Sequence, residues 1–192
     1  MPDQGLNRES KHQRNRRRIR RLTQGAVLTA LALVLSIVER WIPLDLIVPI
    51  PGIKLGLANI VTLFALLRLS PLDAAIILLI RSLVMGLITG PTTLMFSLAG
   101  GALALLAMWL LSRFEGRAFS LIGISLAGAA AHNIGQIGIA VLLLSEPLLM
   151  LMYLPPLLLA GLVTGTLTGI AAFPIAARFS RQKMSKESRL AG

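Results

Sequence analysis

The sequence contains no cysteine and few histidines, acidic residues or aromatic residues. It has no Cys, two His, eight Asp or Glu, and 5% aromatic residues. The lack of cysteine excludes both a disulfide framework and a thiolate metal site. Since one of the two histidines, His12, lies in the N-terminal tail, we expect no bound metal. We also expect no cofactor.

Catalytic motifs are missing as well. The chain has no phosphate-binding loop with its lysine, no GxSxG motif and no paired carboxylates. Its three aspartates are too far apart to hold Mg²⁺ against a diphosphate: Asp3, Asp45 and Asp73. We therefore expect a protein that is not an enzyme. Active transport by such a chain would need an ion gradient or a partner ATPase.

Apolar residues dominate what is present. Hydrophobic residues make up 55% of the 192 residues and charged residues only 14%, with a mean hydropathy of +0.79. Soluble domains carry about 25% charged residues. The composition therefore predicts a membrane protein, and the length allows one domain.

The positive charge lies mainly at the two ends of the chain. Of the net charge of +11, residues 1–21 carry +6 and residues 178–192 carry +4. Basic tails around an apolar body are typical of cytoplasmic segments beside anionic lipid. RNA binding is the weaker interpretation because the basic run contains no aromatic residue for base stacking. We expect a six-helix membrane domain at 22–177 between two basic cytoplasmic tails, and no nucleic-acid partner.

Six apolar segments predict an all-α bundle of six membrane-spanning helices, since a span takes about 20 residues. The second segment is short unless Lys54 or Arg68 reaches toward the interface. Pro155 and Pro156 predict an irregular start for the sixth. The first span is preceded by a long basic region and followed by no convincing cleavage site, which favours a retained helix over a signal peptide. The predicted spans are Leu22 to about Val38, about Leu55–Leu69, Leu72–Thr89, about Thr92–Leu111, about Ser120–Leu144 and about Pro147–Ala177.

The basic residues also predict the orientation of the spans. With both termini in the cytoplasm, most basic residues lie inside and only Arg40 and Lys54 lie outside, as the positive-inside rule requires. The plasma membrane of a bacterium is the expected location. The apolar loop 39–54 is the longest connection between spans. It is either a lid over an outward-facing cavity or a stretch packed on the neighbouring helices.

Polar side chains interrupt the fifth span. His132 and Gln136 are four positions apart and therefore share a helix face, which Asn133 flanks. Polar groups inside a membrane bundle often mark a ligand site or water cavity. The alternative is hydrogen bonding between helices, worth about 1–2 kcal/mol per contact in model peptides. Three polar residues within five positions favour the ligand site.

Two further polar residues lie in other predicted spans. Arg81 is near the middle of the third span, where a charge faces the interior of the bundle. Its partner is a carboxylate of the protein, carbonyls of the protein or an anionic group of a ligand. The position of the acidic residues near span ends favours the ligand over a carboxylate of the protein. Asn59 in the second span is another candidate for an inward-facing ligand contact.

Small residues indicate where helices pack closely. Gly161, Gly165 and Gly169 form a repeated GxxxG pattern in the sixth span, for which packing within the chain is the favoured interpretation. Ala26 and Ala30 form a small-xxx-small pair in the first span.

Several sequence blocks resemble the Gx transporter family, whose bacterial members are often labelled heptaprenyl diphosphate synthase component I. The resemblance covers about residues 22–175. The blocks that carry it are PGIKLGLANIVTLFAL (51–66), the span with Arg81, FSLAGG (96–101), AGAAAHNIGQ (127–136) and YLPPLLLAGLVTGTLTG (153–169).

This family looks like the substrate-binding S components of energy-coupling factor transporters. The resemblance implies six membrane helices, a vitamin-like ligand near the outer face, and partners consisting of a shared transmembrane subunit and two ATPases. Ala26 and Ala30 match the position of an Ala-xxx-Ala contact with the shared subunit. By position in the family, His132, Asn133, Gln136, Tyr153 and Lys54 are implied as substrate-binding residues.

The leading hypothesis is therefore a membrane component that binds a small molecule and delivers it with energy-coupling partners. One alternative is a non-catalytic membrane subunit linked to heptaprenyl diphosphate or quinone biosynthesis. Another is an autonomous secondary transporter. The sequence does not name the substrate.

Overall fold

The computed structural model describes residues 3–42, 54, 56–116 and 118–190, and the side chains of residues 13–42, 54, 56–116 and 118–172. Most of the predicted outer loop, residues 43–53, lies outside the described residues. All regular elements among the described residues are helices, in the order α1 (Asp3–Glu39), α2 (Asn59–Arg68), α3 (Pro71–Thr89), α4 (Pro91–Ser112), α5 (Leu121–Leu144) and α6 (Leu148–Leu190).

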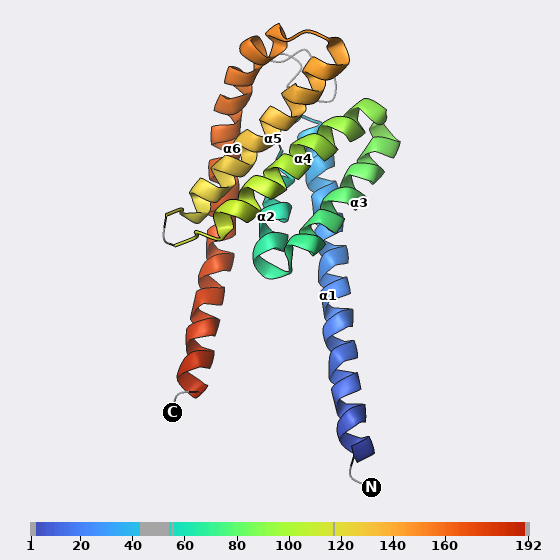
Figure 1. Cartoon of the computed structure of the whole chain (residues 1–192), viewed down its shortest axis with the longest axis vertical. Coiled ribbons are helices and arrows are strands. Elements are labelled where there is room, and N and C mark those ends of the chain that lie inside the picture. The colour runs from blue at the N-terminus through green and yellow to red at the C-terminus, as the bar shows by residue number, and fades with distance from the viewer. Residues whose placement is uncertain (1–2, 43–53, 55, 117, 191–192) are drawn as a thin grey trace.

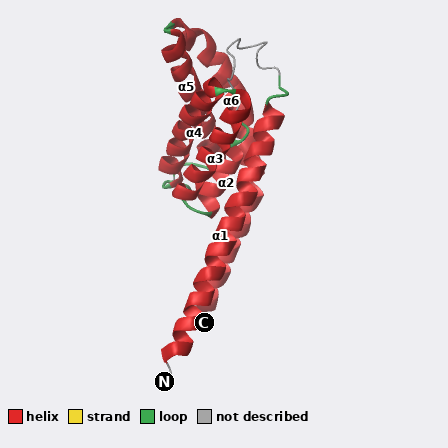
Figure 2. Cartoon of the chain, turned by 90° about the vertical axis from the view of Figure 1, so that its right-hand side faces the viewer, coloured by secondary structure: helices red, strands yellow, loops and turns green. Residues whose placement is uncertain are grey.

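Five of these helices are long and apolar enough to cross a membrane. The segments that meet both conditions are Gln13–Glu39, Pro71–Thr89, Pro91–Ser112, Leu121–Leu144 and Leu148–Ala172. Together with the composition, they make the chain an all-helical multi-pass membrane protein. Successive helices run in opposite directions, and α1 lies along one side of the others (Figures 1 and 2).

The short helix α2 differs from the predicted second span. The prediction began it near residue 55, but it begins at Asn59 and has 10 residues. At 1.5 Å per residue it is about 15 Å long, half the thickness of the hydrocarbon core. Its short length is compatible with a central position, because α2 contacts all five other helices. Its buried residues include Val61, Leu63 and Ala65.

Proline and glycine mark the turns between α2 and α3 and between α3 and α4. Ser70 caps α3 by accepting a hydrogen bond from the backbone N–H of Asp73 at 3.2 Å, and Pro71 occupies the first turn. Gly90 joins α3 to α4 with a φ of 105°, which side chains disfavour, and Pro91 begins α4. These signals explain why α3 and α4 were predicted to within a residue of their bounds.

One prediction about α6 needs correction. α6 is helical through Pro155 and Pro156, where an irregular start was expected. Prolines are tolerated in membrane helices because neighbouring groups satisfy the carbonyls they leave free. The basic tails are also helical, as extensions of α1 and α6. They leave the helical body at the same end (Figure 1).

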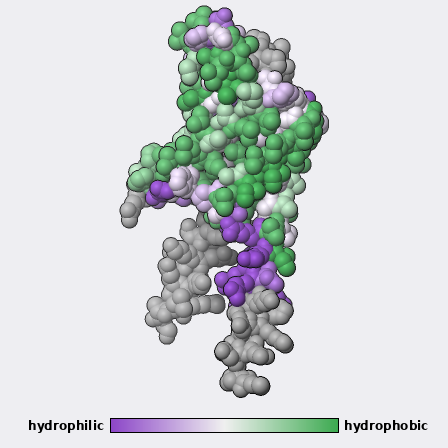
Figure 3. All heavy atoms as spheres, turned by 45° about the vertical axis from the view of Figure 1, so that its right-hand side comes forward, coloured by the Kyte–Doolittle hydropathy of each residue, from purple (hydrophilic) through white to green (hydrophobic). Residues whose placement is uncertain are grey.

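The surface of the helical body is largely apolar. Leu87, Leu142 and Leu151 are among many large hydrophobic side chains that are mostly exposed. Figure 3 shows apolar side chains over most of this face, with hydrophilic ones gathered where α1 leaves the body. Trp41 is exposed just after α1 ends. A surface of this kind fits a hydrocarbon surrounding.

Glycines let α4, α5 and α6 approach closely. A Cβ on Gly135 of α5 would lie 2.7 Å from the carbonyl oxygen of Ala99 in α4. A Cβ on Gly165 or Gly169 of α6 would lie 3.0 or 2.8 Å from backbone atoms of α5. The GxxxG pattern therefore packs within the chain, which confirms the favoured interpretation.

The close contact between α4 and α5 leads to a test with two glycines of the same helix. We expect Gly135→Ala to destabilise the protein by about 1–3 kcal/mol, because backbone atoms block the added methyl group. Gly138→Ala is the control, since a Cβ there would meet nothing within 4 Å. Thermal unfolding in detergent measures both, and equal melting temperatures would contradict the packing.

Candidate functional site

A group of buried polar residues lies where α1 ends and α2 begins. We call it the polar core and define it by its members Glu39, Lys54, Asn59, Arg81, His132 and Gln136. They come from α1, the segment before α2, α2, α3 and α5. The structure therefore brings together five of the seven predicted substrate-binding residues with Glu39, which was not predicted.

Gln136 holds the backbone of the segment before α2. Its Oε1 accepts a hydrogen bond from the N–H of Lys54, and its Nε2 donates one to the carbonyl oxygen of Lys54, both at 2.7 Å. A side-chain amide thus replaces the strand or helix partner that the Lys54 backbone lacks. Both functional atoms of the amide are engaged, so Gln136 positions this segment.

Glu39, the last residue of α1, holds the same segment from the other side. Its carboxylate accepts a hydrogen bond from the N–H of Gly56 and interacts electrostatically with Lys54 and Arg81. The side chain is only 3% exposed. Sequence reasoning missed this role because Glu39 sits at the end of a span, where a carboxylate ordinarily reaches water. The available signal was a carboxylate directly following an apolar helix.

His132 lies between two glycines. A Cβ on Gly56 would lie 3.0 Å from its Cδ2, and one on Gly100 of α4 would lie 2.9 Å from its Nδ1. Gly56 has a φ of 82° and is therefore suited to glycine on conformational grounds too. These two positions leave the room that the imidazole occupies, so the ring is held by α4 on one side and by the segment before α2 on the other.

Several buried polar atoms have no hydrogen-bond partner within the described part of the chain. In the polar core they are Lys54 Nζ, His132 Nδ1 and both amide atoms of Asn59. Buried polar groups are rarely left unpaired, because desolvation costs about 1–3 kcal/mol per group. The polar core therefore has spare hydrogen-bonding capacity on three of its side chains.

The charged groups of the polar core are unequal in number. Arg81 is 4% exposed, and its interaction with Glu39 is electrostatic. Glu39, at the end of the first span, is thus a carboxylate that interacts with Arg81. The Lys54 ammonium also interacts electrostatically with the Glu39 carboxylate. Of the carboxylates in the part of the chain that the structure describes, Glu39 alone interacts with both cations.

Two predicted site residues lie apart from the polar core. Asn133 donates from Nδ2 to the carbonyl oxygen of Leu157 at 2.6 Å and lies against Gly161, so it joins α5 to α6. Its Oδ1 has no partner among the described groups. Tyr153 packs on the apolar cluster that contains Phe96 and Ile137.

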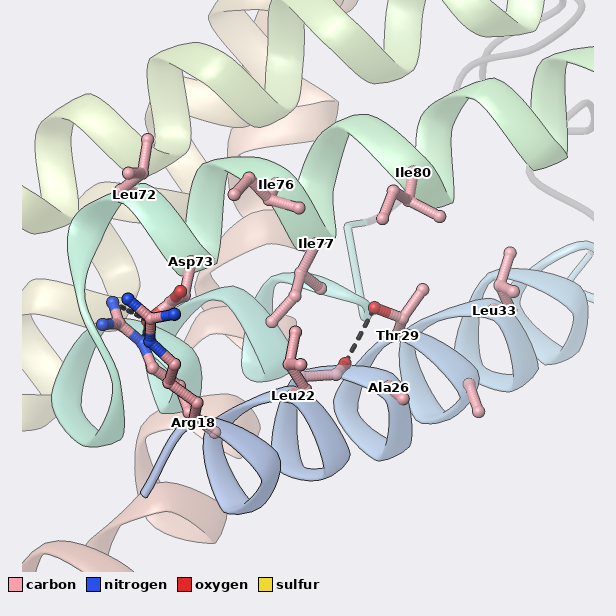
Figure 4. Close-up of a pocket in the computed structure, with 13 residues that line it drawn as sticks. Arg18, Leu22, Ala26, Thr29, Leu33, Leu72, Asp73, Ile76, Ile77 and Ile80 are labelled. Atoms are coloured by element: carbon pink, nitrogen blue, oxygen red, sulfur yellow. Dashed lines mark hydrogen bonds and ion pairs between the residues drawn. The ribbon is translucent and has the colours of Figure 1, made fainter. Parts of the chain in front are cut away.

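An open groove of about 820 Å³ separates α1 from α3. Ala26 and Ala30, the predicted partner-contact pair, line it together with isoleucines of α3 (Figure 4). Arg21 closes one end, donating to Ser70 at 2.7 Å and pairing with Asp73 at 2.5 Å. The small alanine side chains leave a depression into which another helix or a lipid chain fits.

The double hydrogen bond at Lys54 can be tested by removing the amide. Gln136→Met should cost about 1–3 kcal/mol, because it leaves the partly buried Lys54 N–H and carbonyl without their partner. Hydrogen exchange at the Lys54 amide should accelerate. Gln24→Met, at an exposed position of α1, is the control and should leave this exchange unchanged. Unchanged protection of Lys54 in Gln136→Met would show that the amide does not hold the segment.

The described side chains include no group of three or more His, Cys, Asp or Glu that is suited to hold a metal ion. No curated protein and no solved structure matched the chain. A family model described as heptaprenyl diphosphate synthase component I matches residues 28–174, which is most of the chain. By that match, the chain belongs to the heptaprenyl diphosphate synthase component I family.

Proposed function

We propose that the protein is the substrate-binding membrane component of an energy-coupling factor type importer. It binds a small vitamin-like or cofactor-like molecule at the polar core and performs no catalysis itself. The observation that carries this proposal is the spare hydrogen-bonding capacity of His132, Asn59 and Lys54 inside an apolar helical body. A polar ligand would supply the missing partners.

The way in which the segment before α2 is held supports this assignment. Gln136 holds the backbone of Lys54, Glu39 holds that of Gly56, and His132 lies against Gly56. Ligand-binding side chains on such a supported frame lose little conformational entropy on binding. His132 and Asn59 contact the ligand directly in this proposal, whereas Gln136 acts by positioning Lys54.

In this proposal the protein crosses the plasma membrane of a bacterium six times, with α2 and the segment before it making the second passage. Both basic tails lie in the cytoplasm beside anionic lipid. Support comes from the two tails leaving the same end of the body and from their net charges. The polar core then lies toward the outer face, where a ligand enters.

The proposed partners are an energy-coupling transmembrane subunit and two ATPases. The groove between α1 and α3 is the proposed docking surface for the transmembrane subunit, because Ala26 and Ala30 allow close approach of another helix there. The alternative function is a non-catalytic membrane subunit of polyprenyl diphosphate synthesis, which the description of the family favours. An autonomous secondary transporter is a third candidate.

Mass spectrometry of the purified protein tests the binding site. Protein from a rich-medium culture, purified in mild detergent, should carry a stoichiometric small molecule. His132→Leu and Asn59→Leu should reduce its recovery about tenfold, the factor that corresponds to 1.4 kcal/mol of binding free energy. Ser125→Ala removes a buried hydroxyl of α5 outside the polar core. It is the control and should retain the molecule. Wild-type protein without any bound molecule would contradict the proposal.

The docking surface is tested by filling the groove. Ala30→Leu should reduce copurification of the energy-coupling subunit about tenfold, because the larger side chain prevents close approach of the partner helix. Ala102→Leu is the matched control, since it fills a different groove between α3 and α4. Copurification of a prenyl diphosphate synthase catalytic subunit without any ATPase would instead favour the alternative function. Gradient-driven uptake by this chain alone in liposomes would favour a secondary transporter.

A further inference from the structure

The charges of the polar core do not balance. Its described residues contain two cationic side chains, Lys54 and Arg81, and one carboxylate, Glu39. Glu39 interacts with both cations, while its carboxylate also accepts the hydrogen bond from Gly56. Lys54 Nζ is buried and has no hydrogen-bond partner among the described residues. Among the described residues, one positive charge is therefore left without a counter-charge.

An excess charge in this position is costly. Arg81 and Glu39 are 4% and 3% exposed, so water contributes little to their solvation. In a medium of low dielectric constant, a charge is stable only if an opposite charge and hydrogen bonds replace its hydration. Glu39 provides one negative charge for two cations. Its carboxylate also accepts the hydrogen bond from the N–H of Gly56.

We propose that the ligand of the polar core carries a single negative charge, as in a small carboxylic acid. This inference rests on the proposed function and names the class of its substrate. The acidic group lies between Arg81 and Lys54, and its charge brings the polar core to neutrality. The uncharged part of the ligand meets His132 and Asn59, where His132 Nδ1 and both amide atoms of Asn59 have no hydrogen-bond partner among the described residues.

The charge count distinguishes a singly charged acid from neutral and doubly charged ligands. A neutral ligand would leave the excess cation buried, and a doubly charged ligand would leave an excess anion. Both are disfavoured inside a membrane protein for the same reason. Selectivity for a singly charged acid thus follows from one carboxylate opposite two cations.

The experiment compares charge variants of the full-length protein. Small molecules are extracted from wild type, Arg81→Gln and Lys54→Gln and identified by mass spectrometry, and the recovered compound is then tested for binding beside its neutral amide. We expect an acid with one ionised group, recovered at least tenfold less from both variants. We also expect the amide to bind wild type at least tenfold more weakly than the acid. In Arg81→Gln we expect the amide and the acid to bind about equally well.

Two controls separate charge from folding. Arg113→Gln removes one positive charge outside the polar core, where Arg113 lies over the ring of Trp109, and should retain the acid. Arg81→Lys keeps the charge and should recover at least part of the binding. The melting temperature of ligand-free Glu39→Gln should fall below wild type and rise again in Glu39→Gln/Arg81→Gln, because the double variant lowers the net charge of the polar core from +2 back to the wild-type +1.

Other outcomes overturn the inference and leave the proposed function standing. A neutral or doubly charged molecule whose recovery depends on His132 would show a binding site of a different charge class. Loss of the acid in Asp45→Asn, a position outside the described residues, would assign the missing counter-charge to the chain itself. Equal binding of the acid and its amide to wild type would exclude the charge as a determinant.

Discussion

The arrangement of the helices depends on how backbone groups outside a helix are satisfied within an apolar body. Unpaired N–H and carbonyl groups are too costly at membrane depth. The segment before α2 meets this constraint with two side chains, the amide of Gln136 at Lys54 and the carboxylate of Glu39 at Gly56. With these contacts, α2 begins inside the body and contacts every other helix.

The same constraint explains which parts of the fold were predictable. Long apolar runs specify α3, α4 and α5 closely, because local signals decide where each helix starts: a Ser-Pro turn, a Gly-Pro turn and the capping Ser120, respectively. The start of α2 depends on hydrogen bonds from residues 17 and 82 positions away, which no local pattern contains. Continuity of α6 through Pro155 and Pro156 likewise depends on the neighbouring helices.

The candidate site was predictable as a set of residue types and less so as an arrangement. The spacing of His132 and Gln136 correctly placed both on one face of α5. Helical periodicity did not separate Asn133 from His132 and Gln136. Asn133 donates instead to the carbonyl of Leu157 in α6. Nor did helical periodicity reveal Glu39, because the contact between the end of α1 and the segment before α2 depends on the tertiary fold. The negative charge of Glu39 nevertheless enters the charge count of the polar core, where it opposes two cations.

α1 is attached at two points, and their separation has a consequence for the thickness of the surrounding bilayer. Arg21 joins it to the start of α3, and Glu39 joins it to the segment before α2. Glu39 lies 18 positions after Arg21, which is five full turns of helix and about 27 Å. Both attachments therefore lie on the same face, at a spacing close to the hydrocarbon thickness of about 30 Å. Inserting one residue between them would rotate one attachment by about 100° relative to the other. The length of this stretch of α1 is thus under geometric constraint, although most of its side chains face lipid.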